Sequence, residues 1–217
     1  MSRAATASAG VPSLEQWTGA FGDAYVDRNA FSPAKLKPGM AAFERMLPGR
    51  GARSILEVGS NVGLNLRYVR ALRPTAKLFA VEPNAKAFAQ LTREPSLALA
   101  GAWQASAQAL PLADDSVDLA FTCGVLIHVP PDELGRATDE IVRVSRRYVL
   151  CAEYFSHTPT EAPYRGQSGL LFKRDFGAWY ADRFPQLRCT NYGFLWQREL
   201  PAFDNIHWWL FKKRSSR

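Results

Sequence analysis

The sequence predicts an α/β fold with one doubly wound, mostly parallel sheet of seven strands. Short apolar runs alternate with amphipathic stretches from Arg53 onward, which is the pattern of successive βα units. Two further strand-like runs near the C-terminus can pair as an antiparallel hairpin at a sheet edge. The predicted strands cover residues 54–58, 77–81, 97–103, 117–122, 148–152, 187–197 and 206–212.

Two helical segments are expected before the first strand. Residues Ser13 to Gln16 have the form of a capping box, and apolar residues follow them at helical spacing to about Asn29. A second helix is predicted over residues 33–47, interrupted or kinked by Pro38 and Gly39. We expect residues 13–50 to form a helical lid that precedes the main fold.

The middle of the chain has the alternation that a parallel sheet requires. Helical spacing is present between the predicted strands at residues 63–72, 84–92 and 131–144. We therefore expect residues 53–155 to form a core of βα units, the part of such a fold that binds a cofactor.

The last part of the chain has a different rhythm. A loop with proline and glycine covers residues 156–169, and a helix is predicted over residues 173–184. Together with the final hairpin, these elements make up residues 156–213 of a single domain that spans residues 13–213. We expect this part to face the molecule that accepts the transferred group, and we call it the acceptor side. A basic tail at residues 214–217 ends the chain.

Length and composition exclude several classes of protein. The 217 residues fit one domain, and fractions of 47% hydrophobic and 22% charged residues are typical of a globular protein in water. No apolar run approaches the roughly 18 residues of a membrane span. Residues 1–12 are small and mostly polar, typical of a disordered leader and not of a secretory signal. The scattered cysteines and histidines lack the spacing of a metal site or a disulfide framework, so we expect a cytoplasmic protein without metal or membrane association.

A net charge of +7 raises the question of a nucleic-acid partner. Positive charge is concentrated at the extreme C-terminus, on Lys212, Lys213, Arg214 and Arg217. A solvated tail accounts for this concentration better than a nucleic-acid surface does. We expect no nucleic-acid partner.

A glycine turn follows the first predicted strand. Glu57 lies near the end of this strand, and Gly59 and Gly63 frame a turn that opens into a helix. Glycine lets a ligand approach the backbone, and the helix N-terminus offers free N–H groups. The signal is weak by itself, because a tight βα turn with no ligand has the same pattern.

A second acid, Glu82, ends the next predicted strand, and it follows Gly59 by about 20 residues, the distance at which a carboxylate binds ribose hydroxyls. The same pattern of a glycine turn and a strand-end acid could bind a nicotinamide dinucleotide, which is the first alternative ligand to consider. Its G-x-G-x-x-G fingerprint is incomplete here, and Glu57 would repel a pyrophosphate. The positive ammonium or sulfonium of S-adenosyl-L-methionine (SAM) suits Glu57 better.

The chain resembles the class I SAM-dependent methyltransferases in five segments that keep the order and spacing of that family. They are Glu57, residues 59–63, residues 82–84, residues 105–111 and residues 118–124. The resemblance implies a Rossmann-like fold, a ribose site at Glu82 and Pro83, an adenine site at Ser106 and Ala107, and a cleft beside Thr122 and Cys123. Asn61 stands where many members have a middle glycine, which leaves the path of the turn open.

Six more segments resemble the pseudaminic acid biosynthesis-associated methylases, between about Trp17 and Lys212. They are residues 21–29, 124–128, 152–154, 163–166, 171–176 and 192–194. The family name implies an association with nonulosonate sugars and leaves the acceptor atom open.

The resemblance also implies that the N-terminal helix closes over the cofactor, with Tyr25, Arg28 and Asn29 gripping the methionine carboxylate. An arginine fork and an amide are apt partners for a carboxylate. Trp17 and Phe21 would form the apolar face of the lid. In the alternative interpretation, Arg28 is a solvated charge at a helix end.

Methyl transfer from a sulfonium is an in-line displacement, in which holding the acceptor on axis contributes up to about 7–11 kcal/mol. His128 follows the fourth strand, and its ordinary pKa of about 6.5 suits a general base. Glu153, at the end of the fifth strand, is the second candidate. A structural role for His128 stays an equal alternative.

Residues expected on the acceptor side are His128, Tyr154, Tyr164, Arg165, Lys173 and Arg174. Their charge indicates an anionic acceptor such as a sugar acid, although Lys173 and Arg174 could equally face solvent.

The predicted function is methyl transfer from SAM to an O or N atom of a small polar, anionic metabolite, with release of S-adenosyl-L-homocysteine (SAH). The alternatives are a tailoring methyltransferase of another natural product, an RNA or protein methyltransferase, and a non-catalytic SAM-binding module. The protein is expected to be a monomer or a homodimer.

Overall fold

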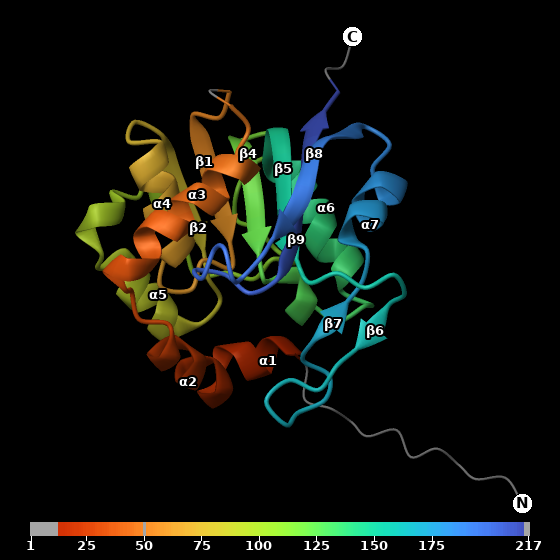
Figure 1. Ribbon diagram of the computed structural model, residues 1–217, viewed down its shortest axis with the longest axis horizontal. Helices are drawn as coiled ribbons and strands as arrows, with labels where there is room; N and C mark the ends of the chain where they lie inside the picture. The colour runs from red at the N-terminus through yellow and green to blue at the C-terminus, as the bar shows by residue number, and fades with distance from the viewer. Residues whose placement is uncertain (1–12, 50, 215–217) are drawn as a thin grey trace, which may run out of the picture.

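A seven-stranded sheet forms the centre of the protein, in the order β3-β2-β1-β4-β5-β9-β8 (Figure 1). Its strands are β1 (Ser54–Val58), β2 (Lys77–Val81), β3 (Gly101–Trp103), β4 (Val117–Cys123), β5 (Ser145–Glu153), β8 (Leu187–Leu195) and β9 (Ile206–Lys213). The first five are parallel, β9 is antiparallel to β5, and β8 is antiparallel to β9. The predicted fold class is confirmed.

This structure is a computed structural model that describes residues 13–49 and 51–214. The predicted leader at residues 1–12 and residues 215–217 of the predicted basic tail at 214–217 lie outside the described residues. The side chain of Ser13, on which the predicted capping box depends, is also outside them.

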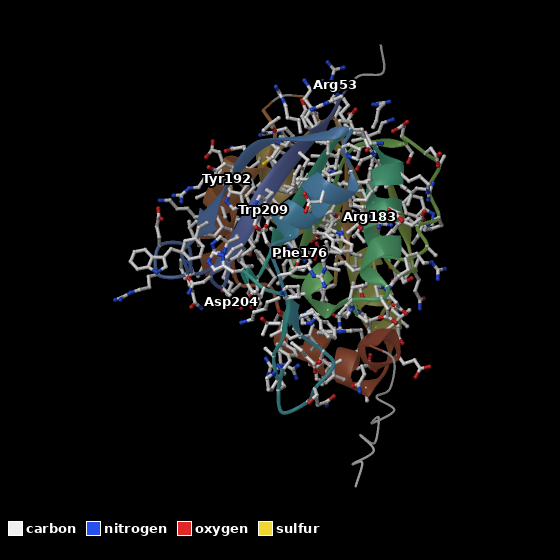
Figure 2. The ribbon with its side chains drawn as sticks, turned by 90° about the vertical axis from the view of Figure 1, so that its right-hand side faces the viewer. Arg53, Phe176, Arg183, Tyr192, Asp204 and Trp209 are labelled. Atoms are coloured by element: carbon white, nitrogen blue, oxygen red, sulfur yellow. The ribbon has the colours of Figure 1, made fainter. Side chains whose placement is uncertain are left out.

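Helices cover both faces of the sheet because alternate strand residues face opposite sides. In β1, Ile55 belongs to the apolar core on the side of α3 and α4, whereas Leu56 belongs to the core on the side of α6 and α7. The four helices are α3 (Leu36–Met46), α4 (Leu64–Leu72), α6 (Leu134–Val144) and α7 (Phe176–Arg183). On the α7 side, Phe176 of α7 lies in the second of these cores and Trp209 of β9 packs against it (Figure 2). A further helix, α5 (Ala85–Thr92), follows β2.

The strand order reverses between β1 and β4. From β1 the chain proceeds to β2 and β3 at one edge, and it then returns to β4 and continues toward the other edge. The loops after β1 and β4 therefore diverge and leave a crevice at the carboxyl ends of the strands, which is where open α/β sheets bind ligands.

Two short helices, α1 (Ser13–Thr18) and α2 (Ala20–Arg28), lie at that end of the sheet (Figure 1). The sequence predicted one helix here, but the chain bends at Gly19. The predicted interruption at Pro38 and Gly39 is wrong, because α3 continues through both residues. Pro38 lies in the first turn of α3, where a backbone N–H has no intrahelical partner, so the helix tolerates it. The change of geometry comes earlier, between a 3₁₀ turn (Pro33–Lys35) and α3.

Several other boundaries differ from the prediction, among them the starts of β3, β5 (Ser145 and not residue 148), α6 (Leu134 and not residue 131) and α7. β3 begins at Gly101 and not at Leu97, because Pro95–Leu97 form a 3₁₀ turn that buries Leu97 outside the sheet. α7 begins at Phe176, after Asp175, whose Oδ1 accepts a hydrogen bond from the Ala178 N–H at 2.8 Å as an N-cap.

Within the loop predicted at residues 156–169, β6 (Thr160–Glu161) forms a small antiparallel sheet with β7 (Phe172–Lys173), which follows that loop. None of the described helices combines the length and apolar character needed to cross a membrane.

Candidate functional site

A cavity of about 460 Å³ lies at the carboxyl ends of the parallel strands. Residues at the ends of four strands line it: Gly59 after β1, Glu82 after β2, Cys123 in β4 and Tyr154 after β5. Side chains of α1 and α2 line it as well, so the cavity is enclosed between the sheet and these helices.

The turn between β1 and α4 needs glycine at two positions. Gly59 and Gly63 have φ of 76° and 77°, the left-handed region that favours glycine. A Cβ on Gly59 would lie 2.6 Å from Val125, and one on Gly63 would lie 2.6 Å from Leu97. Asn61, with φ of 46°, takes the left-handed conformation in place of the middle glycine, which asparagine tolerates better than most residues.

Two backbone N–H groups hold the Glu82 carboxylate in place. Its Oε2 accepts a hydrogen bond from the Asn61 N–H at 2.7 Å, and its Oε1 accepts one from the Asn84 N–H at 2.8 Å. Burial raises the pKa of the Glu82 carboxyl, and the two N–H bonds oppose this rise. Each carboxylate oxygen keeps a further lone pair with which to accept a hydroxyl.

Glu57 and Asn61 present acceptor atoms that no described residue satisfies. Glu57 is only 1% exposed, and its Oε1 accepts a hydrogen bond from Asn65 Nδ2 at 2.8 Å. Glu57 Oε2 and Asn61 Oδ1 are buried without a hydrogen-bond partner in the part of the chain that the structure describes. Burial raises the pKa of Glu57 well above its ordinary value, and the neighbouring Glu82 raises it further. An ammonium group is a hydrogen-bond donor of the kind that both atoms lack, so the chemistry of these residues fits the ammonium group of SAM.

Most of the residues predicted from the sequence to bind the cofactor line this cavity. Those that line the cavity are Tyr25, Asn29, Gly59, Asn61, Glu82, Pro83, Ser106, Ala107 and Cys123. Arg28, Glu57, Gly63 and Thr122 do not line it. Glu57 and Gly63 nevertheless belong to the β1 end and its turn, whereas Thr122 is buried within β4.

The predicted grip on the methionine carboxylate is incomplete. Asn29 Nδ2 donates to the Tyr25 carbonyl at 2.8 Å, and both residues line the cavity. Burial raises the pKa of the Tyr25 phenol to about 12. Arg28 is exposed, with Cζ 5.8 Å from the centre of the Tyr25 ring. The structure therefore favours the solvated interpretation of Arg28.

His128 lines the cavity as a neutral ring. Its Nδ1 lies 2.6 Å from the Leu170 carbonyl oxygen, and because a carbonyl only accepts, Nδ1 carries the proton and Nε2 carries the lone pair. Burial lowers the pKa of His128 to about 4. The ring lies 4.4 Å from the Trp17 ring and 5.2 Å from the Tyr164 ring, centre to centre.

Glu153 does not line the cavity, and its position disfavours the predicted role as a base. Its side chain is fully buried and accepts hydrogen bonds from three backbone N–H groups, of Val125 (3.2 Å), Leu126 (3.1 Å) and Ile127 (3.3 Å). Burial raises the pKa of the Glu153 carboxyl to about 7, and the N–H bonds limit the rise. Glu153 thus holds the loop after β4.

On the acceptor side, Tyr154, Tyr164 and Arg165 line the cavity as predicted, but Lys173 and Arg174 do not. The Lys173 ammonium lies 5.6 Å from the Tyr154 ring centre. Arg174 instead places its Cζ 4.9 Å from the Trp179 ring centre. The expected cluster of positive charge is therefore smaller than the sequence indicated.

Several lining residues were not predicted, chiefly Lys35, Asn65, Asn84, Gln197 and Asp204. Asp204 lies between β8 and β9 (Figure 2) and accepts a hydrogen bond from Tyr154 Oη at 2.6 Å. Burial and this carboxylate raise the pKa of the Tyr154 phenol. No local pattern marks Asp204, because the hairpin alone carries it to the cavity.

No group of three or more His, Cys, Asp or Glu residues is placed to hold a metal ion within residues 13–49 and 51–214.

Residues 56–152 match the protein family described as Methyltransferase domain. The matched segment begins in β1, ends in β5 and contains the glycine turn and Glu82. A search of curated protein sequences finds no match.

Solved structures of low sequence identity share the fold. The Burkholderia thailandensis 1,6-didemethyltoxoflavin-N1-methyltransferase, bound to 1,6-didemethyltoxoflavin and SAH, is 17% identical with a TM-score of 0.70, over 97% of this chain and 94% of its own. A chain from the Haloferax volcanii complex that contains the Trm112 methyltransferase activator is 14% identical with a TM-score of 0.68, over 90% and 96%. A SAM-dependent methyltransferase from Aquifex aeolicus is 14% identical with a TM-score of 0.65, over 88% and 98%.

Proposed function

We propose that this chain, a SAM-dependent methyltransferase by its matched domain and its fold, transfers the methyl group to an oxygen or nitrogen atom of a small polar acceptor. One observation carries the proposal: a single cavity is lined both by the strand-end acid Glu82 with the glycine turn and by the polar and aromatic side chains of His128, Tyr154 and Tyr164. Such a cavity can hold a nucleoside and a second small molecule together.

In this proposal the residues of β1 and β2 bind SAM. Glu82 accepts hydrogen bonds from the ribose hydroxyls, and Glu57 Oε2 with Asn61 Oδ1 accepts from the ammonium group. Ser106 and Ala107, which line the cavity after β3, face the adenine. Bound SAM supplies a methyl group that its sulfonium activates toward a nucleophile.

The polar and aromatic residues enclose and orient the acceptor. Tyr154, Tyr164 and His128 line this part of the cavity, the acceptor end, and come from three separate segments. Methyl transfer needs the nucleophile close to the methyl carbon and on axis, so this enclosure supplies most of the expected acceleration. The lone pair on Nε2 of His128 accepts the proton of the acceptor. A base with a pKa near 4 is weak, which favours an acceptor whose proton becomes acidic during transfer.

The finer part of the proposal is an acceptor that carries both an acidic group and a hydroxyl or amino group. Arg165 and Lys35 line the cavity and supply positive charge, while Tyr154 with Asp204 receives a hydrogen-bond donor. Sugar acids, including the nonulosonates that the sequence resemblance implies, have both groups. The Burkholderia methyltransferase, whose structure contains 1,6-didemethyltoxoflavin, supports a small acceptor.

Incubation with methyl-labelled SAM and fractionated cell extract tests this function. We expect label in a small acidic metabolite, together with SAH in equal amount. Label in RNA or protein fractions would support the alternative class of methyltransferase. If SAH binds but no fraction becomes labelled, the chain is a binding module.

His128→Ala tests the role of His128 on the acceptor so identified. We expect kcat to fall by about 100-fold, because positioned proton transfer contributes about 10²–10⁴. The dissociation constant of SAH should stay within about threefold. Normal turnover in the variant would remove His128 from the chemistry.

A further inference from the structure

Asn84 joins three segments of the protein through one buried amide. It is 3% exposed, and its Oδ1 accepts a hydrogen bond from the Ala87 N–H at 2.8 Å, which caps α5. Its Nδ2 donates to the Trp17 carbonyl at 3.1 Å and to Asp23 Oδ1 at 2.9 Å. Asn84, which lies between β2 and α5, is therefore hydrogen-bonded to both α1 and α2.

The same residue is tied to the acid of the proposed ribose site. The Asn84 backbone N–H donates to Glu82 Oε1 at 2.8 Å. A ligand that binds the Glu82 carboxylate therefore acts on a residue whose side chain holds the N-terminal helices.

An asparagine is needed here for its donors and not for the cap. Serine or aspartate would cap α5 equally well, but neither offers two amide N–H groups. The junction is also tight, since a Cβ on Gly22 would lie 1.8 Å from the Trp17 carbonyl oxygen and 2.9 Å from Asn84 Nδ2.

The position of Trp17 decides the shape of the acceptor end. Its ring centre lies 4.4 Å from that of His128, 5.3 Å from that of Tyr25 and 6.4 Å from that of Tyr164. Each of these residues lines the cavity. A displacement of the Trp17 backbone would therefore open the side of the cavity where the acceptor is enclosed.

We infer that Asn84 is a positioning residue that couples cofactor binding at Glu82 to closure of α1 and α2 over the acceptor end. The inference rests on the proposed function only in taking SAM or SAH as the ligand at Glu82. Since coupling is reciprocal, helices held closed by Asn84 must strengthen cofactor binding as much as the cofactor strengthens closure.

Asp23→Ala and Asp27→Ala form a matched pair of variants on α2. Both remove an aspartate carboxylate, but Asp23 contacts the buried Asn84, whereas Asp27 contacts Lys86 in an exposed ion pair at 2.6 Å. Two measurements compare them: calorimetric titration with SAH, and the rate of chymotrypsin cleavage within α1 and α2 with and without saturating SAH.

We expect saturating SAH to slow cleavage of the wild type and of Asp27→Ala by about tenfold or more. In Asp23→Ala, the dissociation constant of SAH should rise by about tenfold, as for loss of a buried hydrogen bond to a charged group. Protection by saturating SAH should fall below about twofold, an effect that a purely structural contact would not produce. Full protection in Asp23→Ala would overturn the inference.

Exchange of the two side chains guards against simple destabilisation. Asn84→Asp removes the donors and sets a carboxylate against Asp23, so it should lose both affinity and protection. The double variant Asn84→Asp/Asp23→Asn restores one amide and one carboxylate in the reverse order. The amide now on α2 can donate to the carboxylate after β2, so protection should return to within about threefold of wild type. A folded double variant without recovery would contradict the coupling. Absence of SAH binding to the wild type would instead refute the proposed function.

Discussion

Three buried glutamates at the carboxyl ends of the parallel strands have different chemistry because their hydrogen-bond partners differ. Glu82 has one backbone N–H bond on each oxygen and faces the cavity. Glu57 has an oxygen without a partner among the described residues, and so can receive a cation. Glu153 is sealed behind the loop after β4, where it accepts from three N–H groups. At the scale of the residue, the neighbours and not the residue type decide which acid binds a ligand.

Glu153→Gln should change how stability depends on pH. The folded pKa of about 7 lies above the ordinary value of 4.5, so between these values the folded state binds more protons than the unfolded state. The free energy of unfolding should therefore fall as pH rises through this window, by up to about 3 kcal/mol more in the wild type than in the variant.

Urea unfolding of both proteins at pH 5 and pH 8 measures this difference. The raised pKa values of Glu57 and Glu82 affect both proteins and cancel in the comparison. Parallel pH dependence in the two proteins would show that Glu153 keeps an ordinary pKa.

At the scale of the element, the contact between α3 and α4 depends on one glycine. A Cβ on Gly39 would lie 2.5 Å from the Tyr68 ring, which is itself 2% exposed and packs 6.1 Å from Phe43, centre to centre. Because Gly39 has no side chain, α3 lies close enough to Tyr68 for this ring to join the core. The chain thus accepts a poor helix former in exchange for close packing.

Gly39→Ala should lower the free energy of unfolding by about 1–3 kcal/mol, as overpacking of a filled core does. The gain of up to about 1 kcal/mol in helix propensity acts in the opposite direction and is outweighed. Urea unfolding measures the change. Gly49→Ala is the control, since a Cβ there meets nothing within 4 Å and the change should stay within about 0.5 kcal/mol. Equal stabilities of the two variants would mean that α3 shifts at no cost.

At the scale of the whole molecule, the cavity is assembled from both ends of the chain. Trp17 and Tyr25 come from the N-terminal helices, Glu82 and Cys123 from the sheet, and Asp204 from the final hairpin. No single segment forms a site for a nucleoside and an acceptor. A ligand in this cavity therefore binds only the folded state and must stabilise it by mass action.

SAH should raise the midpoint of thermal unfolding. At a concentration of about 100 times its dissociation constant the gain is about 2.7 kcal/mol, which corresponds to about 5–10 °C for a chain of this size. Scanning calorimetry measures the shift, and NAD at the same concentration is the control. A shift with NAD and none with SAH would favour the dinucleotide interpretation of the glycine turn.

The fold was largely predictable because its signals are local. Each of the five parallel strands lies in a short apolar run, and the bounds of β1 and β2 are those predicted. The strand-end residues of the site, such as Glu82 and Tyr154, were also predictable, since the carboxyl ends of parallel strands meet at one edge. Leu97 shows the limit: a buried apolar residue has the same signature in a 3₁₀ turn as in a strand.

By itself, the sequence determined the α/β class, the glycine turn and the acids beside it, because these depend on neighbouring residues. Only the tertiary structure decided where loop residues and side chains point. It sealed Glu153 behind a loop, left Lys173 and Arg174 out of the cavity lining and brought Gln197 and Asp204 into it. Such choices depend on contacts between segments far apart in the chain, and no local pattern of residues encodes them.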